Sequence, residues 1–211
     1  MKKIIIIAVL LFWCDLAFSQ NDSLQSTNDV TASSKAFRVN PNLRIYYIVP
    51  NGVGDNVIAK ANDGVYGLGM RTNIFKYYGF HAGIGFESLQ YKVTDAALAG
   101  NIKHTKFSTV FFEAMYEIPV NSKLTIFPKA SFGNARLHQK TGGKSYGRQS
   151  GSTLGLGVNI DYLLAKNLEV FAGANYLMSR LDVVTSRDME DFYGNVSQMN
   201  FAVGLKFNFR N

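Results

Sequence analysis

Apolar residues alternate with polar or small residues over long stretches of this chain, and this period of two constrains the fold more than any other feature. The C-terminal stretch shows it most plainly. Its apolar positions are Phe201, Val203, Leu205, Phe207 and Phe209. The positions between them are Ala202, Gly204, Lys206, Asn208 and Arg210. Because successive side chains of a β-strand point to opposite faces, the stretch predicts a strand with one apolar and one polar face.

Similar alternation recurs along most of the chain. The stretches that show it are residues 43–49, 66–75, 78–87, 109–118, 124–133, 154–164, 168–178 and 201–210. Most have about the ten residues that a strand of an outer-membrane barrel needs to cross its bilayer. We therefore predict an all-β fold, an eight-stranded antiparallel transmembrane β-barrel.

The connections between these stretches alternate in length. Short ones are residues 76–77, 120–123 and 165–167, and long polar ones are residues 51–63, 94–101, 139–148 and 184–195. Short periplasmic turns and longer external loops are typical of bacterial outer-membrane barrels. An even number of strands then returns both termini to the periplasm. Pairing of the first strand with the last leaves no strand edge exposed to hydrocarbon.

The N-terminus has the features of a secretory signal peptide over residues 1–19. A basic MKK precedes the apolar run IIIIAVLLFW, which is too short to span a membrane as a helix. Ala17 and Ser19 are the small residues of a cleavage site before Gln20. We predict a flexible, Ser/Thr/Asn-rich periplasmic lead-in over residues 20–36 and the barrel over residues 37–211.

A lipoprotein signal acylated at Cys14 is the alternative for this segment. Leu11, Phe12 and Trp13 precede the cysteine, whereas lipoprotein processing needs small residues there. Cleavage before Gln20 removes the only cysteine, so the mature chain is expected to have no disulfide and no thiol catalysis.

The charge of the mature chain is moderately basic. Removing Lys2, Lys3 and Asp15 leaves 20 basic and 14 acidic side chains, a formal net charge of +6. These charges are scattered along the alternating stretches and form no basic helix or run, so we predict no binding of nucleic acid. Anionic lipid head groups of the outer membrane are the expected partners.

Two segments carry a resemblance to a known family. YEIPVNSKLTIFPKASFG resembles a strand, a periplasmic turn and the next strand, and the terminal FAVGLKFNFRN is similar to the signal read by the barrel-assembly machinery. That signal favours an aromatic terminal residue, whereas Arg210 and Asn211 follow Phe209 here. From residue 37 to the end, the chain resembles the outer-membrane protein β-barrel family, the small OmpX/OmpA-like barrels. The resemblance implies insertion by that machinery, and we expect a monomer.

The polar faces of the predicted strands place charges of both signs in the lumen. These residues are Arg71, His81, Glu87, Glu113, Glu117, Lys129, Asp161, Glu169, Lys206 and Arg210. The interior of an eight-stranded barrel is about wide enough for side chains to fill it. We therefore predict a structural network of paired charges that needs no cofactor or metal. A narrow porin-like channel or proton path is the alternative.

A lipid-modifying enzyme is the alternative from a different class. His104 and His138 fall near the external ends of strands, together with Ser108, Ser145 and Ser150. A histidine could activate one of these serines against a lipid ester. Because no nucleophile motif frames the serines, we predict that the protein is not an enzyme and has a structural or surface-interaction role.

The predicted external loops carry opposite charges. Residues 139–148 contain Lys140, Lys144 and Arg148, which could contact the phosphates of lipopolysaccharide. The last loop contains Asp188, Glu190 and Asp191. Contact between these two loops is the alternative use of their charges.

Overall fold

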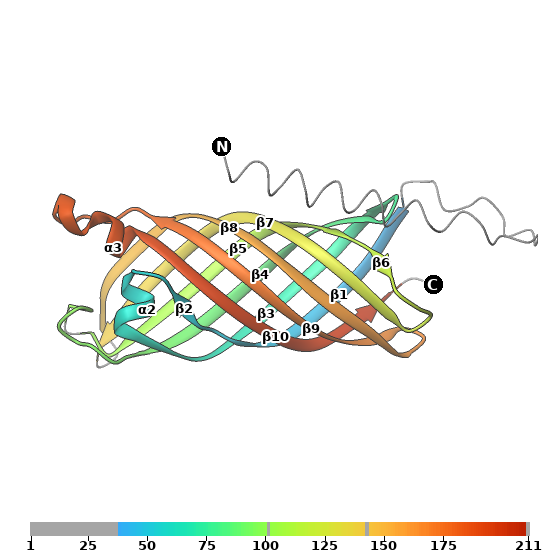
Figure 1. Ribbon diagram of the computed structural model, residues 1–211, viewed down its shortest axis with the longest axis horizontal. Coiled ribbons are helices and arrows are strands. Elements are labelled where there is room, and N and C mark those ends of the chain that lie inside the picture. The colour runs from blue at the N-terminus through green and yellow to red at the C-terminus, as the bar shows by residue number, and fades with distance from the viewer. Residues whose placement is uncertain (1–37, 101, 142–143, 210–211) are drawn as a thin grey trace, which may run out of the picture. The chain divides into compact units, whose positions relative to one another are not determined.

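The structure, a computed structural model, describes residues 38–100, 102–141 and 144–209. Eight long antiparallel strands form a barrel (Figure 1). These strands are β1 (Arg38–Val49), β3 (Asn62–Tyr77), β4 (Phe80–Val93), β5 (His104–Tyr116), β7 (Leu124–Thr141), β8 (Lys144–Ala165), β9 (Leu168–Leu181) and β10 (Asn195–Asn208). Each pairs with the next in this order, and β1 also pairs with β10. The predicted eight-stranded antiparallel barrel is confirmed.

The closing pair joins the first strand to the last. Asn42 lies opposite Asn208, and the register continues to Val49 opposite Phe201. The predicted first strand, residues 43–49, therefore exists and begins earlier, at Arg38. Because each long strand has two neighbours, the ring leaves no open edge whose backbone groups would lack partners in hydrocarbon.

Short elements complete the fold. They are β2 (Gly52–Val53), α2 (Val57–Ala61), β6 (Ile118–Pro119), the 3-10 helix η1 (Arg187–Met189) and α3 (Glu190–Gly194). The side chain of Asn56 caps α2 by accepting hydrogen bonds from the backbone N–H groups of Ile58 and Ala59. Within the described ranges, no helix is both long and apolar enough to cross a membrane.

The two ends of the barrel differ. One end, called the turn end below, holds the start of β1, the end of β10 and the short connections (Figure 1). In the connection from β3 to β4, Tyr78 and Gly79 have φ values of 47° and 82°, as the tight turns of hairpins require. The other end, called the loop end, carries α2 and α3.

The predicted loop over residues 139–148 is wrong. β7 continues to Thr141 and β8 begins at Lys144, so most of these residues belong to the two strands at the tip of a hairpin. Arg148 lies opposite His138, and Ser145 lies opposite Lys140. Backbone pairing in a hairpin does not require apolar and polar side chains to alternate. Because the residues here are polar on both faces, the sequence pattern did not indicate strands.

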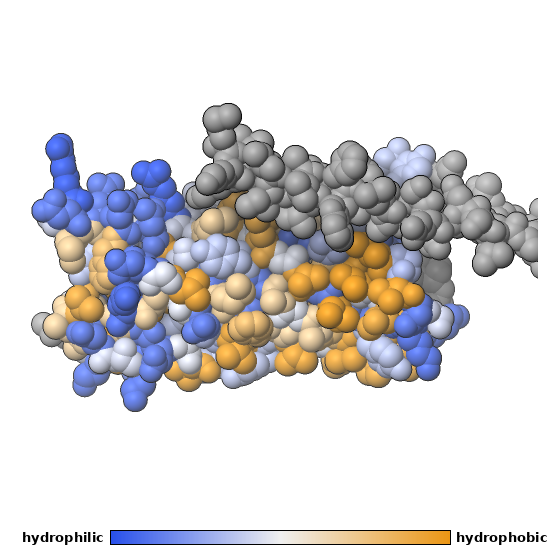
Figure 2. All heavy atoms as spheres, in the orientation of Figure 1, coloured by the Kyte–Doolittle hydropathy of each residue, from blue (hydrophilic) through white to orange (hydrophobic). Residues whose placement is uncertain are grey.

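The faces of the strands change character along the barrel. Near the turn end of β5, Phe112 points outward and is 71% exposed, whereas Glu113 points inward and is 4% exposed. Near the loop end of β5 the pattern inverts, because Lys106 points outward and Phe107 is fully buried. Figure 2 shows the apolar side chains over the middle and turn end of the barrel and hydrophilic ones over the loop end. Each strand thus has a segment suited to a bilayer and an extension suited to water.

Candidate functional site

A buried ion-pair group in the lumen is centred on Asp161. Arg44 donates from Nη1 to Asp161 Oδ1 over 2.9 Å, and its Nη2 lies 2.8 Å from Asp161 Oδ2. Both side chains are 0% exposed. Lys206 Nζ bridges Asp161 Oδ2 at 3.3 Å and Glu169 Oε2 at 3.0 Å, and Asn208 Nδ2 donates to Glu169 Oε1 over 2.6 Å. This group joins β1, β8, β9 and β10 across the interior.

A second group is centred on Glu113. Arg71 donates from Nη1 to Glu113 Oε2 over 2.7 Å, and Lys129 Nζ lies 3.6 Å from the same oxygen. Nearby, the hydroxyl of Tyr46 donates to Glu87 Oε1 over 2.8 Å. Gly69 makes room for the tyrosine, since a Cβ at Gly69 would lie 2.2 Å from its ring. β1, β3, β4, β5 and β7 are thereby connected through side chains as well as backbone.

Aromatic rings fill the space between these charges. The guanidinium carbons of Arg44 and Arg71 lie 5.0 Å and 5.2 Å from the ring centre of Phe171. Arg44 and Lys206 also lie over Phe127, at 5.2 Å and 5.0 Å. Such cation–π contacts stabilise cations that burial has stripped of water. In the middle of the lumen, charged side chains are therefore packed against aromatic rings.

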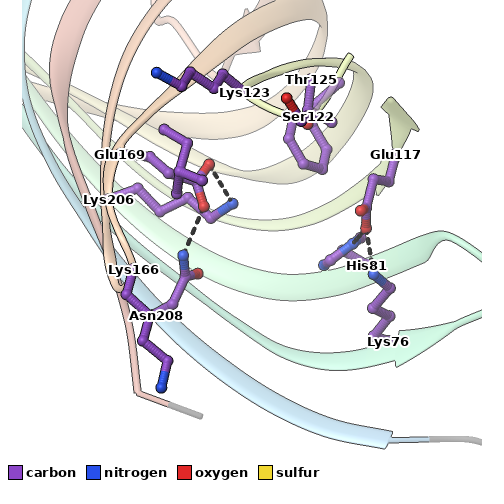
Figure 3. Close-up of a pocket in the computed structure, with 12 residues that line it drawn as sticks. Lys76, His81, Glu117, Ser122, Lys123, Thr125, Lys166, Glu169, Lys206 and Asn208 are labelled. Atoms are coloured by element: carbon purple, nitrogen blue, oxygen red, sulfur yellow. Dashed lines mark hydrogen bonds and ion pairs between the residues drawn. The ribbon is translucent and has the colours of Figure 1, made fainter. Parts of the chain in front are cut away.

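A cavity opens at the turn end of the lumen and has a volume of about 290 Å³. Figure 3 shows Lys76, His81 and Glu117 converging on one side of it and Lys206, Glu169 and Asn208 on the other. Glu117 Oε2 lies 2.5 Å from Lys76 Nζ and 2.7 Å from His81 Nε2. Phe127, only 2% exposed, also lines the cavity.

The carboxylate of Glu117 lies outside the membrane-crossing strands, between β5 and β6. Burial acts to raise its pKa, but hydrogen bonds from His81 and Lys76 outweigh burial and lower the pKa to about 2. Glu117 is therefore ionised across the physiological pH range, and it holds Lys76 and His81 at the mouth of the lumen.

The loop end of the lumen is filled by apolar side chains. Those from the strands include Ile48, Leu89, Tyr91, Phe107, Leu137, Leu181 and Val196, and those from α2 are Val57, Ile58 and Ala61. The hydroxyl of Tyr91 donates to Gln198 Oε1 over 2.8 Å. This cluster, called the apolar plug below, lies beyond the ion pairs along the barrel.

The residues that the sequence assigned to the lumen are brought together as follows. Arg71, Glu113 and Lys129 form one group, and Asp161, Glu169 and Lys206 form another. His81 and Glu117 meet at the turn end, and Glu87 accepts from Tyr46. Arg210 lies outside the described residues. Sequence reasoning missed Arg44 and Lys76; with them, the described residues place five Lys and Arg side chains and five carboxylates in the lumen.

The residues assigned to the external rim lie on the outer wall. His104, His138, Lys140 and Arg148 belong to strand extensions at the loop end. The side chains of Lys144 and Ser145 are outside what the structure describes. On the last loop, Asp191 Oδ1 accepts from Asn195 Nδ2 over 2.8 Å. Across the described ranges, no cluster of three His, Cys, Asp or Glu side chains could hold a metal ion.

Comparisons with known proteins concern the fold. No protein-family model matches the chain, and no curated protein matches its sequence. Among solved structures, Neisserial surface protein A superposes with a TM-score of 0.63 at 15% identity, covering 80% of this chain and 97% of that one. The outer membrane protein OprG from Pseudomonas aeruginosa superposes with a TM-score of 0.51 at 10% identity, covering 84% and 99%. The chain therefore has the fold of small outer-membrane β-barrel proteins, as the resemblance of its sequence implied.

Proposed function

We propose that this protein is an integral outer-membrane β-barrel with a lumen closed by its own side chains, and that its role is structural or lies in contacts at the cell surface. The observation that carries this proposal is the filling of the lumen from the cavity at the turn end to the loop end. Ion pairs and aromatic rings occupy the middle, and the apolar plug follows towards the loop end.

The outward face supports a position in a membrane. Large apolar side chains on this face are exposed: Val110 by 60%, Phe112 by 71% and Phe132 by 62%. Their contact with water would be unfavourable, whereas contact with the hydrocarbon of a bilayer is not. On β8 the outward apolar residues run from Leu154 to Leu164. At about 3.4 Å per residue and a tilt of about 40°, they cover about 26 Å of membrane thickness. An outer-membrane barrel has an apolar band of about 25 Å.

The alternation of connections supports one orientation. In this proposal the turn end, which holds the start of β1 and the end of β10, faces the periplasm. The loop end, with α2 and α3, faces the outside of the cell. Export by residues 1–19 and insertion by the barrel-assembly machinery precede this state. In the same proposal residues 20–36 are the periplasmic lead-in; the signal peptide and the lead-in both lie outside the described residues.

The closed lumen distinguishes this role from that of a porin-like channel. Arg44 and Asp161 are held by two contacts and are 0% exposed, so a passing ion would have to separate them. Separating a buried pair leaves uncompensated charges, which costs about 3–5 kcal/mol. We therefore propose a barrel that conducts no solutes.

The proposal assigns no catalysis to the outer wall. The charged residues that act on His138 are all cations: Arg148, Lys140, Lys106 and Arg136. A histidine that activates a serine works best with an acid that orients it and stabilises its charged form. The surroundings of His138 supply the opposite charge.

Location and orientation are tested together by single-cysteine labelling. The only cysteine, Cys14, lies in the leader, so Ser186→Cys at the loop end and Ser122→Cys at the turn end give clean reporters. A membrane-impermeant maleimide should label Ser186→Cys in intact cells and Ser122→Cys only after the outer membrane is permeabilised. Equal labelling of both in intact cells, or of neither after permeabilisation, would contradict the proposal. The unsubstituted protein is the control.

A further inference from the structure

A group of basic side chains covers one side of the outer wall at the loop end. It consists of His104 and Lys106 on β5, Arg136, His138 and Lys140 on β7, and Arg148 on β8. These six residues are called the cationic band. They alternate along the strands with inward residues such as Phe107, Ala135 and Leu137, which are all buried. The packing inside the barrel therefore fixes the band on the outside.

Strand register places members of the band directly opposite one another. His104 lies opposite Lys140, Lys106 opposite His138, and His138 opposite Arg148. Each of these pairs sets a histidine opposite a Lys or Arg, so the Lys and Arg side chains of the band lie beside or diagonal to one another and not directly opposite. Over the part of the chain that the structure describes, no ion pair joins a member of the band to a carboxylate. Two acids lie near its edges: Asp63, opposite Lys92, which in turn lies opposite His104, and Asp182, whose backbone N–H donates to the carbonyl of Ser150, the residue opposite Arg136.

The electrostatic environment of His138 reflects this concentration of positive charge. His138 lies six residues beyond Phe132, the outward aromatic residue at the edge of the apolar band on β7. Burial, and then the charges of Arg148, Lys140, Lys106 and Arg136, lower the pKa of its imidazole below the ordinary value. An anion placed among these groups would supply the counter-charge that no ion pair of the described residues provides.

The height of the band above the hydrocarbon selects among anions. Lys106 and His104 lie four and six residues beyond Val110, and Arg148 lies six beyond Leu154. At about 3.4 Å per residue and a tilt of about 40°, these positions are about 10–16 Å above the apolar band. Phospholipid head groups extend only about 5–8 Å beyond the hydrocarbon on each side. Lys106 can bend down to such a head group, whereas His104 and Arg148, six residues up, match a lipid whose phosphates sit on a taller head group.

We infer that the cationic band binds the phosphate groups of lipopolysaccharide in the outer leaflet. The inference rests on the proposed location of the barrel, since only that leaflet presents this lipid beside β5, β7 and β8. Lys140 and Arg148, which the sequence placed in a loop, take part as members of a rigid strand wall. Adjacent strands are about 4.8 Å apart, so one phosphate can contact cations from two strands at once.

The test uses the full mature chain, purified and refolded in a zwitterionic detergent. One variant combines Lys106→Gln, Arg136→Gln and Arg148→Gln. The matched control combines Lys60→Gln, Lys123→Gln and Lys166→Gln, which removes the same charge from outside the band. The probe is purified rough lipopolysaccharide, compared with the same material after enzymatic dephosphorylation and with phosphatidylglycerol. Affinity is measured by titration calorimetry.

The unsubstituted protein and the control variant should bind lipopolysaccharide with similar affinity. The band variant should bind it on the order of a hundredfold more weakly, since each Lys or Arg near an anionic membrane surface contributes about a factor of five to ten. Dephosphorylation should weaken binding to the unsubstituted protein and to the control variant, and should have little further effect on the band variant. Equal binding by all three proteins, an equal loss in the control, or equal affinity for phosphatidylglycerol would overturn the inference.

Thermal unfolding of the band variant tests whether it is folded. Without lipopolysaccharide it should unfold at the same temperature as the unsubstituted protein or higher, because the substitutions relieve repulsion. If the band variant unfolded at a lower temperature than the unsubstituted protein and still bound lipopolysaccharide equally well, the band would stabilise the fold and would not be a lipopolysaccharide site. None of these measurements depends on closure of the lumen or on orientation in cells, so their failure is distinguishable from failure of the proposed function.

Discussion

Arg71 and Glu113 meet inside the barrel with Nη1 of the arginine 2.7 Å from Oε2 of the glutamate, and each side chain is 1% exposed. They come from β3 and β5, which are separated by β4 in the ring. The pair therefore spans the interior and connects strands that share no backbone hydrogen bonds. Its second cation, Lys129 on β7, lies 3.6 Å from the same oxygen.

Removing the negative charge of this group should destabilise the barrel strongly. Glu113→Gln leaves Arg71 and Lys129 without their shared carboxylate, and breaking a buried pair costs about 3–5 kcal/mol. Urea unfolding in lipid vesicles measures this loss. Replacing all three members, Arg71→Met, Glu113→Leu and Lys129→Met, should recover much of it. A cost below about 1 kcal/mol for Glu113→Gln would show that the pair is solvated and the lumen wetter than described.

The two cations around Asp161 should differ in importance. Arg44 contacts both oxygens of Asp161 and lies against Phe127 and Phe171, whereas Lys206 contacts a single Asp161 oxygen at 3.3 Å. Arg44→Met should therefore lower the unfolding temperature more than Lys206→Met does. Heat-modifiable migration on gels gives both temperatures. The reverse order would contradict the central place assigned to Arg44.

The mouth of the lumen should give stability a specific dependence on acid. The pKa of Glu117 is lowered from 4.5 to about 2, so its contribution is fully present above pH 4.5. That contribution should be lost as the pH falls from about 4.5 towards 2. In Glu117→Gln this part of the pH dependence should be absent. Unfolding followed between pH 5 and pH 2 tests this, and identical profiles for the two proteins would refute it.

The apolar band makes a positional prediction. Phe112→Arg places a charge against hydrocarbon and should cost about 2–4 kcal/mol, whereas a charge near the interface costs about 0–1 kcal/mol. Ser88→Arg, on the outward face of β4 above Phe86, is the matched control. Refolding into vesicles at graded urea concentrations measures both costs. Equal costs for the two variants would mean that Phe112 does not face hydrocarbon more deeply than Ser88 does.

Sequence reasoning located the membrane-crossing part of each strand because hydrocarbon and a polar lumen impose strict alternation there. It missed the extensions, such as Gln139 to Thr141 of β7, because water outside and the apolar plug inside reverse or blur the pattern. α2 escaped notice because its five residues are too few for a helical period. It is held by the cap at Asn56 and by the burial of Ile58.

The candidate site was only partly accessible from the sequence. Charges such as Arg71 and Asp161 stood out against apolar neighbours within long stretches. Arg44 did not, because its stretch is short and follows a polar segment. Lys76 fell in what reads as a turn, and the bulge between Asn73 and Phe75 changes which residues face inward. Which cation meets which carboxylate depends on strand order and tilt, which the alternation does not encode.

Closure of the lumen is tested most directly by the conductance of the purified protein in planar lipid bilayers. The account predicts no stable current above the baseline at moderate voltage, because ion pairs, aromatic rings and the apolar plug fill the interior. Insertion is verified in parallel by resistance of the barrel to protease in the same lipid. A steady, single-sized open current from protein shown to be inserted would contradict the closed lumen and establish a channel.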